Sequence, residues 1–180
     1  MARMRASART VDMLGRQQIA NSSTAISELF KNAYDAYARN VEVDYFRSDG
    51  LLAIRDNGVG MTRDEFENRW LVLGTESKAV EQGQKVDTYR PEGMSERAVM
   101  GEKGIGRLAI ALLGRQVLVI TRAERSDGAH DLVMCFIHWG LFEINGINLE
   151  QIELPIKEVR NGILPSQGNV QELISEVRQN

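Results

Sequence analysis

Three short motifs of this 180-residue sequence carry side chains suited to chemistry. In order they are Glu28-Leu-Phe-Lys-Asn32-Ala-Tyr-Asp35-Ala36, Asp56-Asn-Gly58-Val-Gly60-Met61 and Gly101-Glu-Lys103-Gly104-Ile105-Gly106. Carboxylate and amide oxygens are ligands that Mg²⁺ prefers, and a glycine-rich turn before a helix offers backbone N–H groups to phosphates. Each motif alone is common, but their order along one chain indicates a site for a magnesium nucleotide.

The first motif lies in a helix expected over residues 24–39. At 100° per residue, Asn32 lies about 40° from Glu28 and Asp35 about 20° to its other side, so the three form one polar stripe. The apolar residues lie on roughly the opposite side: Ile26, Leu29, Phe30, Ala33 and Tyr37. By itself this is an ordinary amphipathic helix. With a nucleotide over the stripe, Asn32 would be an oxygen ligand for magnesium and Glu28 could polarise a water aimed at the terminal phosphate.

The second motif follows a predicted strand. Its Asp56 carboxylate could accept a hydrogen bond from an exocyclic amine such as that of adenine. Without side chains, Gly58 and Gly60 would let the ring approach the backbone. The alternative is a plain turn, for which Asp-Asn-Gly is common chemistry.

The third motif, residues 101–106, precedes an apolar helix expected over residues 105–113. Free backbone N–H groups and the positive end of the helix dipole would face a phosphate there, and Lys103 and Arg107 could add charge. It is no dinucleotide fingerprint, because no parallel strand–helix–strand unit surrounds it, and it lacks the Lys-Ser/Thr ending of a Walker loop.

Periodicity and turn residues predict the elements that position these motifs. Helices are expected over residues 10–20, 24–39, 62–73, 105–113 and 170–178, and strands over 41–46, 51–55, 117–121, 132–139 and, at a sheet edge because of Pro155, 151–159. Ser22 or Ser23 is expected to cap the second helix, and Thr62 with Glu65 the third. This order predicts an α+β sandwich, with helices on one face of a mainly antiparallel sheet.

Composition sets the frame for that fold. The length suits a single domain over 1–180, with a core at 10–139, a polar lid at 74–104 and a C-terminal extension at 140–180. A net charge of −3 and a pI of about 5.5 argue against a nucleic-acid groove. No apolar run approaches the roughly 18 residues of a membrane span, so a soluble, cytoplasmic protein is expected. Cys135, the only cysteine, is expected to be a buried, inert thiol.

The three motifs resemble those of the GHKL ATPases: gyrase B, the heat-shock-protein-ninety chaperones, histidine kinases and MutL. ExxxNAxDA matches Glu28, Asn32, Ala33, Asp35 and Ala36; DxGxG matches Asp56, Gly58 and Gly60; GxxGxG matches Gly101, Gly104 and Gly106. Thr75-Glu-Ser77-Lys78 is similar to the start of the lid in MutL-type members. Taken as a whole, the sequence looks most like the bacterial chaperone-like or MORC-like members.

The resemblance implies a Bergerat sandwich that holds ATP or ADP with Mg²⁺ between the helical layer and a mobile lid. By position it implies Glu28 as general base, Asn32 for magnesium, Asp56 for adenine and the glycine box for phosphate. The residues expected to contact the nucleotide are Asn32, Asp35, Asp56, Gly58, Gly60, Met61, Thr75, Lys78, Gly101, Lys103, Gly104, Ile105 and Gly106. A homodimer formed on nucleotide is the implied assembly.

Two departures from the family pattern limit the expected activity. The only Gly-Thr, Gly74-Thr75, precedes the lid rather than opening a late strand. No following domain supplies the usual lysine, so we expect the amino-terminal part of a longer protein, weak or inactive alone. The hypotheses are a slowly hydrolysing clamp, a regulatory module that binds ATP without useful turnover, and a histidine-kinase-like domain. Against the last, His130 and His138 lie in or beside predicted strands.

Overall fold

The computed structural model describes residues 6–17, 19, 21–73, 89–101, 106–161 and 163–179. Its helices are α1 (Arg9–Gln17), α2 (Ser22–Asp35), α3 (Arg63–Glu65), α4 (Ile110–Leu113) and α5 (Gln167–Gln179). A π-helix, η1 (Phe66–Trp70), and 3-10 helices η2 (Gly106–Ala109), η3 (Trp139–Glu143) and η4 (Leu149–Gln151) join them. The strands are β1 (Val41–Phe46), β2 (Leu51–Asp56), β3 (Gln116–Arg125), β4 (Gly128–His138) and β5 (Ile156–Val159).

Both ends of α2 are closed by local hydrogen bonds. Asn21 is the N-cap, and its side chain accepts from the Thr24 backbone N–H at 2.9 Å. The prediction of Ser22 or Ser23 as cap was therefore wrong, because the helix begins at Ser22, two residues before the expected start at residue 24. At the other end Tyr37 has a left-handed φ of 62°.

The strands form two antiparallel groups. β1 pairs with β2 through a hairpin, and β3, β4 and β5 form a three-stranded sheet in that order. The groups are linked where the segment after β2 meets β3. There the Glu124 backbone N–H donates to the Val59 carbonyl at 3.0 Å, and the Met61 N–H donates to the Thr121 hydroxyl at 3.0 Å. β5 lies at the sheet edge, as predicted, but it is shorter than the expected 151–159 and begins at Ile156, directly after Pro155.

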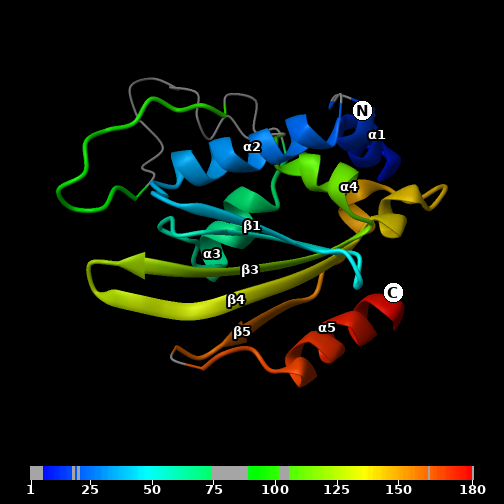
Figure 1. Ribbon diagram of the computed structural model, residues 1–180. Helices are drawn as coiled ribbons and strands as arrows, with labels where there is room; N and C mark the ends of the chain where they lie inside the picture. The colour runs from blue at the N-terminus through cyan, green and yellow to red at the C-terminus, as the bar shows by residue number, and fades with distance from the viewer. Residues whose placement is uncertain are drawn as a thin grey trace, which may run out of the picture.

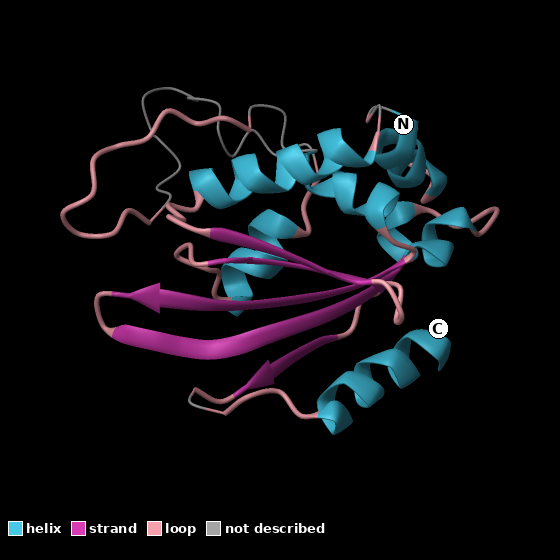
Figure 2. Ribbon diagram, viewed as in Figure 1, coloured by secondary structure: helices cyan, strands magenta, loops and turns pink. Residues whose placement is uncertain are grey.

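The two faces of β4 are buried in separate clusters. Odd-numbered residues from Val133 to Ile137 pack with residues of α1, η1, η2 and α4. Even-numbered residues from Leu132 to Phe136 pack with α5, chiefly against Leu173. In Figure 1, α1, α2 and α4 accordingly lie on one side of the strands and α5 on the other. The predicted α+β class is confirmed (Figure 2), with α5 as an additional cover on the second face.

The segment after β2 enters the core through a capped turn. Thr62 and Glu65 form the predicted capping box. The helix expected over residues 62–73 continues only as the π-helix to Trp70, which stacks on Phe66 at 4.8 Å between ring centroids. Phe66 is fully buried, so this turn fixes the segment onto the β3–β4–β5 sheet.

The thiol of Cys135 agrees with the expectation from composition. Cys135 is buried on β4, and burial raises its pKa to about 12, so the thiol is inert as predicted. Among the residues that the structure describes, no helix combines the length and the apolar character needed to cross a membrane.

Candidate nucleotide-binding site

Helix α2 carries the first motif, and its three polar side chains have different surroundings. The Glu28 side chain, 24% exposed, has Oε1 2.6 Å from the Lys31 Nζ. Asn32 is half-buried, and within the described part of the chain its amide has no hydrogen-bond partner. Both carboxylate oxygens of Asp35 accept backbone N–H groups of a distant segment. On the apolar side of the helix Ala33 is buried, whereas Phe30 is exposed rather than packed into the core.

The start of the glycine motif lies against the last turn of α2. Asp35 Oδ1 accepts from the Met100 N–H at 2.8 Å, and Oδ2 accepts from the Gly101 N–H at 3.0 Å. This contact is between residues separated by 65 positions, so the helix and the motif are brought together by the fold.

The end of the glycine motif lies two turns earlier on the same helix. A β-carbon at Gly106 would be 2.8 Å from Glu28 Oε2, so residue 106 lies directly against the Glu28 side chain, which would have to shift to admit a larger residue. η2 and α4 then continue along α2. Lys103, Gly104 and Ile105 lie outside the described residues, as do Thr75 and Lys78.

The second motif is attached to the C-terminal end of α2. Asp56 is exposed, and its Oδ1 accepts from the Gly58 N–H at 2.9 Å. The Val59 N–H donates to the Ala36 carbonyl at 2.9 Å, and a β-carbon at Gly58 would lie 2.8 Å from that oxygen. The absence of a side chain at residue 58 is therefore explained by packing on α2.

Asn57 completes this attachment. Its Oδ1 accepts from the backbone N–H groups of Arg39 and Asn40 at 2.8 and 2.9 Å. The side chain thus closes the connection between α2 and β1 over the end of β2. Sequence reasoning treated residue 57 only as part of a turn, and its long-range partners have no signal in the motif.

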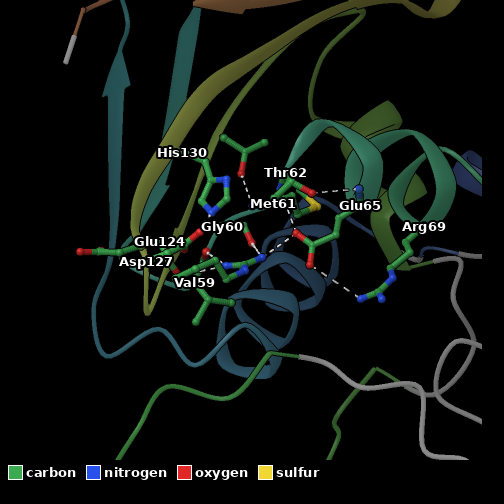
Figure 3. A network of polar contacts seen from close by, with 11 residues as sticks. Val59, Gly60, Met61, Thr62, Glu65, Arg69, Glu124, Asp127 and His130 are labelled. Carbon is green, nitrogen blue, oxygen red and sulfur yellow. Dashed lines mark hydrogen bonds and ion pairs between the residues drawn. The ribbon is translucent and has the colours of Figure 1, made fainter. Parts of the chain in front are cut away.

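Arg125 holds the same motif from the side of β3. Its guanidinium donates to the Val59 carbonyl at 2.7 Å and to Glu65 Oε2 at 2.5 Å. Glu65 lies within this network in Figure 3, with Thr62 on one side and Arg69 on the other. Gly60, with a φ of +59°, and Met61 follow on the loop, where they pack on β3. Arg125 was not singled out from the sequence, because nothing local marks it.

Arg107, considered as a source of positive charge for a phosphate, is engaged elsewhere. Its Nη1 donates to the carbonyls of Arg69, at 2.5 Å, and Trp70. Burial lowers the pKa of this guanidinium from its ordinary value. These bonds satisfy carbonyls at the end of η1, so this nitrogen supports the fold.

The donor set on α2 fits a magnesium ion that is shared with a nucleotide. Within the described ranges, no group of three or more His, Cys, Asp and Glu side chains could hold a metal alone. Mg²⁺ usually keeps several waters and is bound through one or two protein oxygens together with phosphates. The amide oxygen of Asn32 meets that requirement.

One open hollow of about 290 Å³ lies beside the C-terminus of α2. Tyr34, Arg39 and Met94 help to line it, whereas Glu28, Asn32 and Asp56 do not. The prediction that these site residues share one cavity is therefore not met by this hollow. Glu28 and Asn32 lie on α2 itself, and the loop that carries Asp56 is bonded to the residue after its C-terminal end.

The two glycine-bearing motifs thus meet the same acid–amide–acid helix, one at its C-terminal end and the other along its last turns. This arrangement is the one expected of a GHKL ATPase. A family model described as "Histidine kinase-, DNA gyrase B-, and HSP90-like ATPase" matches residues 20–162, and the chain belongs to this family.

Among curated proteins the chain is similar to several chaperones. It is 32% identical over 124 residues to the "Chaperone protein HtpG" of Shouchella clausii, covering 64% of this chain and 19% of that protein. The HtpG proteins of Bacillus licheniformis (32% over 123 residues, 64% and 18% covered) and Clostridium acetobutylicum (26% over 165 residues, 82% and 24% covered) are also similar. The chain therefore spans about a fifth to a quarter of the length of these relatives. All three of these relatives are named as chaperones.

Proposed function

We propose that this chain binds ATP together with magnesium and hydrolyses it slowly, as the nucleotide-gated part of a clamp that dimerises when ATP is bound. The observation that carries the proposal is the attachment of the glycine motif to α2 at both of its described ends, Gly101 at Asp35 and Gly106 at Glu28. Asn32 lies between these two points on the helix. Backbone N–H groups of a glycine turn and an amide oxygen together suit a magnesium-bound phosphate chain.

Asp56 is the residue proposed to recognise adenine. Its Oδ1 accepts the Gly58 N–H, and this bond fixes the orientation of the carboxylate. Oδ2 has no partner within the described residues. A carboxylate oxygen held in this way accepts an exocyclic N–H. Arg125 and Asn57 keep the loop in place from opposite sides.

Asn32 is proposed to hold Mg²⁺, which would neutralise charge on the phosphate oxygens. Glu28 is proposed as the general base, one helical turn before Asn32. The remaining task of the chain is to position these groups, since phosphoryl transfer depends mainly on positioning and charge stabilisation.

A second candidate is an ATP-binding regulatory module without useful turnover. The Lys31–Glu28 ion pair favours it, because it engages one oxygen of the proposed base. Phosphate release from magnesium-ATP over hours, compared with binding, separates the two functions. Binding without release supports the regulatory module.

Asp56→Asn tests nucleotide recognition by isothermal titration with magnesium-ATP. Asparagine keeps an oxygen for the Gly58 N–H but replaces the other oxygen by an N–H₂ donor, which cannot accept from adenine. The expected loss is about 10- to 100-fold in affinity, from a hydrogen bond to a charged group. Asp49→Asn, in the exposed hairpin turn, makes the same chemical change elsewhere and should leave affinity unaltered. Wild-type protein that fails to bind ATP would refute the proposal.

Dimerisation is tested by sedimentation of the chain with and without magnesium and a non-hydrolysable ATP analogue. A nucleotide-dependent shift from monomer to dimer supports the clamp. A monomer under both conditions, with nucleotide bound, rejects dimerisation for this chain while leaving ATP binding intact.

A further inference from the structure

One arginine of the segment 89–101, Arg97, contacts the C-terminal end of α2 and the residues directly after it. The Arg97 Nη1 donates to the carbonyls of Tyr34 and Ala38, both at 2.9 Å. The last carbonyls of a helix have no partner within the helix, and they lie at the negative end of its dipole. The Tyr34 carbonyl also accepts the Tyr37 N–H at 3.0 Å, so the guanidinium adds a second donor there and places positive charge at the negative end of the helix.

Two tyrosine rings also contact the Arg97 guanidinium. The guanidinium carbon is 4.6 Å from the centroid of the Tyr34 ring and 5.3 Å from that of Tyr37, within the range of cation–π attraction. Tyr37 occupies the left-handed position that closes α2, where glycine is the usual residue. The Ala38 N–H bonds to the Ala33 carbonyl across this turn. A tyrosine there is disfavoured by its backbone angle, and the contact of its ring with Arg97 supplies a compensating interaction.

The reciprocal contact comes from the helix. Asp35, next to Tyr34, accepts the N–H groups of Met100 and Gly101. Arg97 of the segment therefore donates to carbonyls at the helix end, and Asp35 of the helix accepts from the segment, beginning at Met100, three residues after Arg97. These contacts fix both position and direction of the chain as it enters the glycine motif.

We propose that Arg97 is a positioning residue for the phosphate end of the nucleotide site, holding Gly101 in place relative to Asn32. This inference rests on the proposed ATP binding and assigns a role to a residue outside the three motifs. Arg97 contacts Tyr34 in the last turn of α2 and Ala38, three residues after the helix ends, and acts through the backbone of residues 97–101. Its loss should leave the adenine loop intact, because Asp56, Asn57 and Gly58 are held by other contacts.

The test compares ATP with adenosine, which lacks phosphates, in binding to the wild-type chain and to Arg97→Gln. Affinities are measured by isothermal titration or by competition in the presence of magnesium. We expect a loss of tenfold or more for ATP and a change of less than twofold for adenosine. Arg97→Lys keeps the charge but not the two-carbonyl geometry, and should retain part of the ATP affinity. Arg90→Gln, an exposed position of the same segment, is the matched control and should behave as wild type.

If Arg97→Gln loses affinity for ATP and adenosine equally, Arg97 only stabilises the fold. If Arg97→Gln binds ATP as tightly as wild type, Arg97 does not position the phosphate site. Either result overturns the inference. If Arg97→Gln does not fold, the same comparison is made with Arg97→Lys, for which a threefold loss specific to ATP is expected. A wild-type chain that binds adenosine and ATP alike would also overturn it. A wild-type chain that binds neither refutes the proposed function itself, which distinguishes the two failures.

Discussion

The backbone at Gly60 approaches the carbonyl of Arg122 so closely that a β-carbon at residue 60 would lie 1.8 Å from the carbonyl oxygen. Gly60 also has a left-handed φ of +59°. Both properties follow from the path of the second motif, which leaves β2 and bonds to β3 through Val59 and Met61. Glycine at residue 60 is thus required by the joint between the two groups of strands.

Gly60→Ala should destabilise the protein more than Gly50→Ala. Gly50, at the tip of the β1–β2 hairpin, has nearly the same φ of +60°, but a β-carbon there would have no atom within 4 Å. Alanine at residue 50 should cost about 1 kcal/mol for its backbone angle. At residue 60 the clash with Arg122 should add about 1–3 kcal/mol. The measurement is the free energy of unfolding in urea, and equal losses at the two glycines would show that the loop relaxes away from β3.

Glu28→Gln should abolish most ATP hydrolysis while leaving ATP binding within twofold of wild type. A general base typically contributes 100-fold or more to the rate, so a fall in kcat of at least about 100-fold is expected. Phosphate release and titration with magnesium-ATP are measured on the same preparation. Hydrolysis that survives intact would remove Glu28 from the mechanism.

Lys31→Met should raise the rate of hydrolysis several-fold. Glu28 Oε1 lies 2.6 Å from the Lys31 Nζ, and removing the ammonium frees that oxygen to accept a proton. Lys31→Arg keeps a cation at the same helical spacing and is the control. A slower rate in Lys31→Met would mean instead that the ion pair holds Glu28 in its working position.

Much of the fold could be predicted from the sequence, because local patterns determine its elements. The β1–β2 hairpin follows from strict alternation and a Ser-Asp-Gly turn, and β1 has the predicted bounds, residues 41–46. The Thr62–Glu65 capping box likewise depends on residues three apart. The cap of α2 was mispredicted by one residue, because Asn, Ser and Thr are all good caps and four of them adjoin.

The site was predictable in its motifs but less so in what holds them together. Asn57, Arg97 and Arg125 act through partners 17 or more residues away. A side chain that bonds to distant backbone N–H groups or carbonyls leaves no periodic or local signature. The two glycines of the second motif were assigned to ligand approach, and the structure gives Gly58 and Gly60 a packing reason as well. Asp35, expected to contact the nucleotide, bonds to the backbone at the start of the glycine motif; its direct contact with a nucleotide stays a prediction.

Glu65→Gln should destabilise the protein by about 1–3 kcal/mol, because it leaves the Arg125 charge without its counter-ion in a largely buried place. Glutamine still offers an oxygen to the Thr62 N–H, so the capping box persists. The change removes only charge, from the Arg125 pair and from the longer contact with Arg69. Arg63→Gln removes the exposed ion pairs with Glu67 and Glu158 and should cost less than about 1 kcal/mol. Urea unfolding of both variants measures the difference; similar losses would show that the Arg125 pair is as well solvated as the exposed pairs.

Cys135 should make the stability of the protein fall with pH above about pH 9. Burial raises the pKa of this thiol from 9.0 to about 12, so the unfolded chain loses the proton first as the pH rises. The folded state then binds one proton more than the unfolded state, and linkage makes the free energy of unfolding decrease by about 1.4 kcal/mol per pH unit. This stabilisation is fully present below pH 9 and is lost progressively towards pH 12.

Cys135→Ala isolates the contribution of the thiol to the pH dependence of stability. Between pH 8 and pH 10 the wild-type protein should lose about 1.4 kcal/mol more stability in urea than the variant does, whatever their difference at pH 8. Iodoacetamide at pH 8 should leave the folded thiol unmodified and alkylate it in urea, because the thiolate is the reactive form. Parallel pH profiles, or rapid alkylation of the folded protein, would contradict the burial of Cys135 between β3 and β5, since a thiol reached by water ionises near its ordinary pKa.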